Sequence, residues 1–166
     1  MRLNGKIETF PRELRYLILA FIVVLSIGFY TGLLFVNETS SGNPNGIEEH
    51  YLGNEDNIDT KVMKFKKNKQ QMLTLVHGHI LSMSIIFFLT GLIFITTRLN
   101  LKLKTLLLIE PFVSIILTFG GIYLLWKGVL WMKYVVMISG VLMTLSYTLV
   151  VLIILKQLLK PAIKLR

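Results

Sequence analysis

Four long apolar stretches constrain the fold of this 166-residue chain more than any other feature. They cover residues 16–36, 72–97, 103–126 and 129–155. Each is close to the roughly 20 residues that an α-helix needs to cross a hydrocarbon core of about 30 Å. Because lipid offers no partner to an unpaired strand edge, the stretches are predicted to be membrane-spanning helices. A mean hydropathy of +0.66 agrees with this class of protein.

The connections between the last three stretches are short, which makes neighbouring helices antiparallel. The predicted fold is therefore an all-α membrane protein, an antiparallel four-helix transmembrane bundle in which residues 1–166 form one domain. The only sizeable polar segment, residues 37–71, is long for a connection without a task. Its start, NETSSGNPNG, is rich in turn residues and is expected to be irregular.

The lysines and arginines predict the orientation in the membrane. One side of the predicted bundle carries eleven of the 18: Arg2, Lys6, Arg12, Arg15, Arg98, Lys102, Lys104, Lys156, Lys160, Lys164 and Arg166. The positive-inside rule therefore predicts that both termini are cytoplasmic and that residues 37–71 face outward, in a plasma (inner) membrane. Since these charges flank spans, the net charge of +9 does not indicate nucleic acid, and lipid is the first expected partner.

Two features that the sequence lacks limit the functions that the chain can have. The chain has no cysteine, which excludes disulfides and thiolate metal or redox sites. It also shows no arrangement of a nucleophile with a base and an orienting residue, so no catalytic activity of its own is expected.

Small and polar residues recur at helical spacing within the stretches, as in helices that pack closely in membranes. Gly28 and Gly32 form a GxxxG motif, and the third stretch aligns Ser114 and Thr118 with Glu110. Both patterns are predicted to face the interior of the bundle.

Three ionisable side chains lie inside the spans. Placing such a group in the bilayer costs free energy, so these residues are candidates for a function. His77 and His79 fall in the predicted outer half of the bilayer, and Glu110 falls in the inner half. Glu110 precedes Pro111, which is expected to kink its helix. A neutral glutamic acid there would hydrogen-bond inside the bundle; proton transfer or hydrogen bonding to a quinone is the alternative.

The two histidines are separated by about 200° around a helix, so they cannot point at one centre. A buried neutral imidazole is a ligand for haem iron or a first-row metal. His77 continues a stripe with Ser84 and Gly91 and is predicted to face packed neighbours. His79 is predicted to be the ligand of haem b or a transition metal; a histidine that only hydrogen-bonds a neighbouring helix, with no cofactor, is the alternative.

The second ligand of the cofactor is predicted to be His50, Met137 or Met132. Space for a cofactor is expected beside the glycines of the outer half, which are Gly28, Gly32, Gly78, Gly120 and Gly121. A separate metal site is predicted at Glu48, Glu49 and His50, whose side chains offer oxygen and nitrogen ligands. The alternative for these three residues is a solvated acidic loop.

The segments GIEEHYLGN and VHGHILSM together resemble small bacterial inner-membrane proteins with four spans. The span histidines are more loosely similar to those of membrane b-type cytochromes, which house haem between helices. That likeness implies ligands on two helices, whereas here both span histidines lie on one. A haem with two histidine ligands would therefore need His50 or a second subunit.

These observations favour a small integral membrane subunit of a respiratory or other envelope complex, with a haem or metal site near the outer face for electron transfer. The first alternative is an accessory, assembly or structural subunit without a cofactor. The second is a small transporter or channel, which four helices would form only as an oligomer. The expected partners are a larger membrane complex or further copies of the chain.

Overall fold

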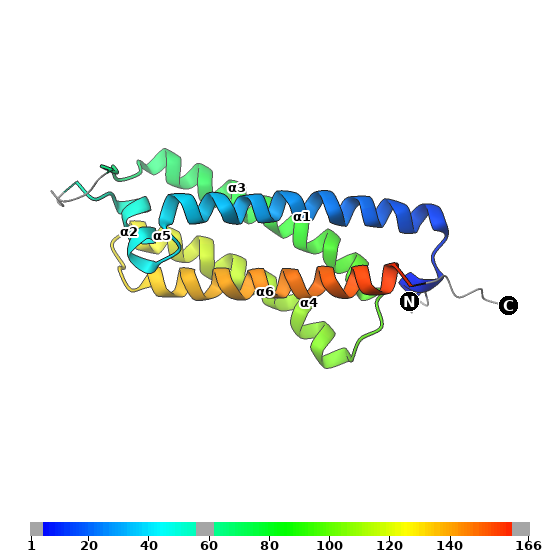
Figure 1. The fold of residues 1–166 in the computed structure, drawn as a ribbon. Helices are drawn as coiled ribbons and strands as arrows, with labels where there is room; N and C mark the ends of the chain where they lie inside the picture. The colour runs from blue at the N-terminus through cyan, green and yellow to red at the C-terminus, as the bar shows by residue number, and fades with distance from the viewer. Residues whose placement is uncertain (1–4, 56–61, 161–166) are drawn as a thin grey trace.

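The computed structural model describes residues 5–55 and 62–160 and confirms an all-α four-helix bundle (Figure 1). The first, second and fourth spans are α1 (Arg12–Ser40), α3 (Lys69–Ile95) and α6 (Met132–Leu158). The third span joins α4 (Leu101–Ile115), the π-helical turn η2 (Ile116–Gly120) and α5 (Gly121–Trp126). Two short helices, η1 (Ile7–Thr9) and α2 (Pro44–Leu52), complete the described chain.

The segment expected to be irregular is largely helical. α1 continues through Ser40 and ends where Ser41 adopts a left-handed conformation with φ of 53°. α2 begins after a turn at residues 41–43. The Asn43 side chain accepts a hydrogen bond from the backbone N–H of Gly46 at 2.8 Å, and Pro44 occupies the first helical position. Asparagine followed by proline is therefore a helix start here, and of the segment expected to be irregular only residues 41–43 form a turn.

α6 is the central helix of the bundle and packs along the whole third span, antiparallel to it. Thr118 on η2 and Ser139 on α6 share a buried hydrogen bond of 2.7 Å. Ser114 is also buried, so the predicted inward stripe of the third span is confirmed. Near the middle of α6, Tyr147 is fully buried and stacks on Phe29 of α1 with a ring separation of 4.0 Å.

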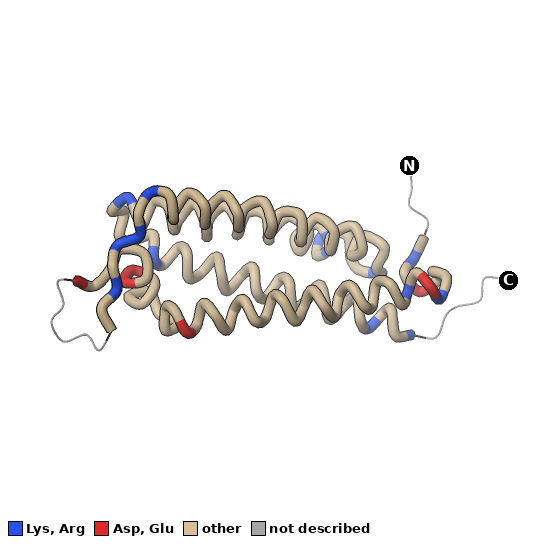
Figure 2. Tube along the Cα trace, turned by 90° about the horizontal axis from the view of Figure 1, so that it is seen from above, with Lys and Arg blue, Asp and Glu red and all other residues tan. Residues whose placement is uncertain are grey.

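α1 and α3 contribute little to this core. Only 11% and 17% of their apolar windows are buried, against 44% and 39% for the third span and α6. Gly28 and Gly32 are exposed, and a Cβ added to either would meet no atom within 4 Å. The GxxxG motif therefore faces away from the bundle, and the prediction that it faces inward was wrong. The charged side chains gather toward the two ends of the bundle (Figure 2), and the apolar middle is left for lipid.

The N-terminal segment closes one end of the bundle. Ile7 is fully buried, and its backbone N–H donates to the carbonyl of Thr96 at 3.1 Å. Glu8 forms ion pairs with Arg98 and with Lys160, close to the end of the described chain. Both described ends of the chain thus lie at the same end of the bundle (Figure 1). That this end is cytoplasmic stays a prediction.

Candidate functional site

The candidate site lies at the start of α3, whose first turn is held by a capping box. The side chain of Asn68 accepts from the backbone N–H of Gln71 at 2.9 Å, and the Gln71 side chain accepts from the N–H of Asn68 at 2.9 Å. This reciprocal pair satisfies two backbone donors that a helix start otherwise leaves open. The Asn-x-x-Gln spacing is readable in the sequence, and it fixes where α3 begins and which way its first side chains point.

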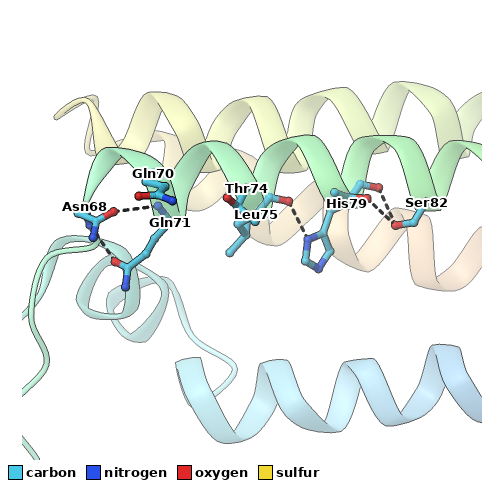
Figure 3. A pocket seen from close by; sticks show the side chains of 8 residues that line it. Asn68, Gln70, Gln71, Thr74, Leu75, His79 and Ser82 are labelled. Carbon is cyan, nitrogen blue, oxygen red and sulfur yellow. Dashed lines mark hydrogen bonds between the residues drawn. The ribbon is translucent and has the colours of Figure 1, made fainter.

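One face of this first part of α3 borders a shallow hollow of about 590 Å³ that is open at the surface of the bundle and not enclosed. All of the lining residues belong to α3 or to its cap: Asn68, Gln70, Gln71, Thr74, Leu75, Gly78, His79 and Ser82. In Figure 3 the imidazole of His79 projects from α3 on the side where α1 runs. The hollow therefore combines amide, hydroxyl and imidazole groups within a span that is otherwise apolar.

The hydrogen bond of His79 determines which of its ring nitrogens is available. Nδ1 lies 2.8 Å from the carbonyl oxygen of Leu75, one turn earlier (Figure 3). A carbonyl only accepts, so Nδ1 carries the proton of this bond. In the neutral ring, Nε2 then holds a lone pair. This is the usual state of a histidine ligand, whose second nitrogen donates to a backbone carbonyl.

A second side chain, Phe119, contacts the imidazole from the third span. The two ring centroids are 4.9 Å apart, with planes inclined by 33°. Phe119 belongs to the π-helical turn η2, and such turns occur often at functional sites. Nothing in the sequence indicated this contact, because Phe119 is one of many aromatic residues in the spans and the π turn has no simple sequence signature.

The side chains of both span histidines are exposed, and they lie on different sides of α3. The buried side chains Met72, Phe87 and Thr90 lie on the face of α3 that includes His79, which follows Met72 by seven residues. His77 lies on the other side and is exposed. The prediction that His77 faces packed neighbours was therefore wrong. That prediction rested on the spacing of seven residues between His77, Ser84 and Gly91, and the last two are only half-buried.

The other predicted ligands are not brought to His79. His50 lies on α2, half-buried against the ring of Tyr51 at 4.8 Å. Met137 is half-buried against the apolar core of the bundle. Neither residue lines the hollow at the start of α3.

Glu48, Glu49 and His50 do not form the predicted metal cluster. They are successive residues of α2, so their side chains diverge by about 100° each. Glu48 is instead paired with Lys133 of α6 at 2.7 Å. Within residues 5–55 and 62–160, no three side chains of His, Asp or Glu come close enough to hold a metal ion.

Glu110 has one partner in the bundle. Ser114, one turn later on α4, donates a hydrogen bond of 2.5 Å to its Oε1. Oε2 is buried and has no hydrogen-bond partner among the described residues. The predicted hydrogen bond inside the bundle therefore exists, within one helix, and half of the carboxyl group is left without a protein partner.

The cavity that the described residues form inside the bundle is too small for a cofactor. The cavity between α3, α4 and α6, beside Tyr147, measures about 10 Å³, which is at most the space of one water. Of the glycines expected to make space, Gly121 is closely packed, since a Cβ there would lie 2.9 Å from Val136. Gly78 borders open space and lines the hollow with His79. Among the described residues, the space beside His79 therefore lies at the side of the bundle and not in its interior.

Four long apolar helices with largely exposed apolar faces define a multi-pass membrane protein. The chain belongs to the family Aq_1264_TM, a transmembrane helical domain whose sequence model matches residues 41–164. The match spans α2, α3, the third span and α6, and begins after α1. No curated protein and no solved structure shows a significant match.

Proposed function

We propose that this protein is a small integral membrane subunit of a respiratory or other envelope complex, and that it holds haem or a transition metal at His79 for electron transfer. The observation that carries the proposal is the hydrogen bond from Nδ1 of His79 to the carbonyl of Leu75. It leaves Nε2, the atom that would bind iron or another metal, beside a hollow of about 590 Å³.

The residues of the hollow fit one ligand of such a group. His79 supplies a single imidazole, and Phe119 covers one side of it with an apolar ring. Within the part of the chain that the structure describes, no second imidazole or thioether lines the hollow. Because the hollow opens to the side of the bundle, a neighbouring subunit would supply the remaining ligand. Bound there, haem or a redox-active metal supplies one-electron chemistry, and the chain's part is to ligate and position it.

The test is the optical spectrum and metal content of the full-length protein, purified in mild detergent from a haem-supplemented host. We expect a Soret band or a stoichiometric metal that is lost in His79→Ala. His77→Ala is the matched control, since His77 is on the same helix, is exposed and points away. Retention of the full cofactor in His79→Ala, or a wild type that never contains one, would overturn the proposal.

A second candidate function is an accessory or assembly subunit without a cofactor. The exposure of α1 favours it, because only 11% of its apolar window is buried and its Gly28 and Gly32 border open space. Helices in membranes associate through such small residues. The chain has no cysteine, so Gly28→Cys introduces a single thiol at this face. Oxidation in membranes should give a crosslinked dimer if a second copy packs there.

A further inference from the structure

Residues 62–68, which we call the strap, run across the α2 end of the bundle just before α3. Asn54 holds the strap by its backbone and its side chain. The N–H of Asn54 donates to the carbonyl of Lys64 at 2.9 Å, and its Oδ1 accepts from the N–H of Lys64 at 2.7 Å. Its Nδ2 donates to the carbonyl of Val62 at 3.1 Å. The backbone of the strap is therefore fixed on the bundle.

Two further contacts position the strap. Gly53 has a φ of 85°, and a Cβ there would lie 2.8 Å from the backbone of both Lys64 and Lys66, so the strap approaches as closely as only glycine permits. The indole Nε1 of Trp126 donates to the carbonyl of Lys67 at 2.7 Å. The strap is thereby attached to the last residue of the third span.

Two lysine ammonium groups lie over the ring of Trp126. Nζ of Lys66 is 5.8 Å from the ring centroid, and Nζ of Lys127 is 5.3 Å from it. Lys127 also lies 5.9 Å from the ring of Tyr123. These distances are in the range of cation–π interactions. Since Trp126 ends a membrane span, both ammonium groups are expected at the level of the lipid headgroups.

The two ammonium groups are not neutralised by a carboxylate among the described residues. Glu55 accepts from the backbone N–H of Lys66 at 3.4 Å and forms no ion pair with its side chain. Lys66 also borders a polar hollow of about 710 Å³ that is lined by Glu48, Glu49 and Glu55. Glu48 is paired with Lys133, and neither of the other two carboxylates forms an ion pair with Lys66 among the described residues. Two like charges held on one ring repel each other, and an anion beside them would remove that repulsion.

The strap also exposes apolar side chains next to its lysines. Val62, Met63 and Phe65 are 67%, 60% and 67% exposed. Apolar side chains alternating with cations at the end of a span are typical of a segment that lies in the membrane interface. In such a segment the apolar groups enter the acyl boundary while the cations remain at the headgroups.

We propose that the strap, together with Trp126 and Lys127, binds the phosphate headgroup of an anionic phospholipid in the leaflet at the α2 end of the bundle. The ammonium groups of Lys66 and Lys127 contact the phosphate oxygens, and Phe65 packs against the acyl chains. The site is independent of His79 and of any cofactor.

The test is native mass spectrometry of the full-length protein released from nanodiscs that contain equal amounts of phosphatidylcholine and phosphatidylglycerol. The wild type should retain phosphatidylglycerol preferentially. With roughly 1 kcal/mol for each basic residue near an anionic surface, each lysine should contribute about a five-fold preference. The double variant Lys66→Gln, Lys127→Gln should lose most of it.

The matched control is Lys102→Gln, Lys156→Gln, which removes two exposed lysines at the other end of the bundle and should leave the preference unchanged. Equal retention of both lipids by the wild type would overturn the proposal. An equal loss of preference in the two double variants would also overturn it, because net charge alone would then account for the lipid preference. Soluble glycerol phosphate should not displace the lipid from detergent-solubilised protein; if it does, the strap binds a free phosphate compound and the lipid assignment is wrong.

Discussion

The carboxylate of Glu8 lies 3.1 Å from Nε of Arg98 and ties the N-terminal segment to the turn between α3 and the third span. The side chain of Glu8 is only 3% exposed. A buried carboxylate is destabilising unless it is paired, so this ion pair holds η1 against the end of the bundle.

Arg98→Ala should lower the free energy of unfolding by about 2 kcal/mol, because it removes a charged hydrogen bond from a buried carboxylate. Lys160→Ala should cost less, since its Nζ lies 3.6 Å from the carboxylate, beyond hydrogen-bond distance. Thermal unfolding in detergent measures both. Equal losses in the two variants would contradict the dominant role of Arg98.

The topology can be tested with single cysteines in this cysteine-free chain. Glu38→Cys and Lys102→Cys place exposed thiols at opposite ends of the bundle. A membrane-impermeant maleimide added to intact cells should label the first, and it should label the second only after permeabilisation, if the termini are cytoplasmic. The reverse pattern would place the termini outside.

Glu110→Gln should leave stability nearly unchanged, because an amide oxygen can accept from Ser114 as Oε1 does. Glu110→Leu should destabilise by roughly 1–3 kcal/mol, since the Ser114 hydroxyl, 2% exposed, loses its side-chain acceptor. Chemical unfolding in mixed micelles distinguishes the two. If both variants are tolerated equally, Ser114 does not depend on the carboxyl group.

The α2 end should lose stability in mild acid. Burial of His50, and then the charges of Lys67 and Lys64, lower the pKa of His50 below its ordinary value of 6.5. The unfolded chain then binds more protons, so stability is complete above pH 6.5 and falls as the pH decreases through 6.5 toward the lower folded pKa. His50→Gln should flatten this dependence in hydrogen exchange of α2. An unchanged profile would exclude His50 as its cause.

Gly46→Ala should destabilise the junction of α1 and α2, because its Cβ would lie 1.9 Å from the backbone oxygen of Ser40. Gly140→Ala is the control. It sits inside α6 with no atom within 4 Å, so alanine there should add up to about 1 kcal/mol through helix propensity. A thermal shift of the same sign in both variants would contradict the close approach at Gly46.

The sequence by itself determined the four spans, because the length and apolarity of a membrane helix are local properties. It also determined that Ser114 and Thr118 share one face, which follows from helical periodicity. It contained the capping signals of α2 and α3 as well. The one at Asn43 and Pro44 lay in a run that was expected to be irregular, since the same residue types occur in turns and at helix starts.

Only the tertiary structure decided which face of each helix is covered. Periodicity places His77 and His79 on different faces, but the position of the neighbouring helices decides that His79, although exposed, contacts Phe119 while His77 does not face packed neighbours. The π turn that brings Phe119 to the imidazole and the ion pair of Glu8 with Arg98 likewise depend on residues far apart in the chain. Lipid and a helix interior are almost equally apolar, so hydrophobicity alone cannot distinguish a lipid-facing side chain from one in the bundle.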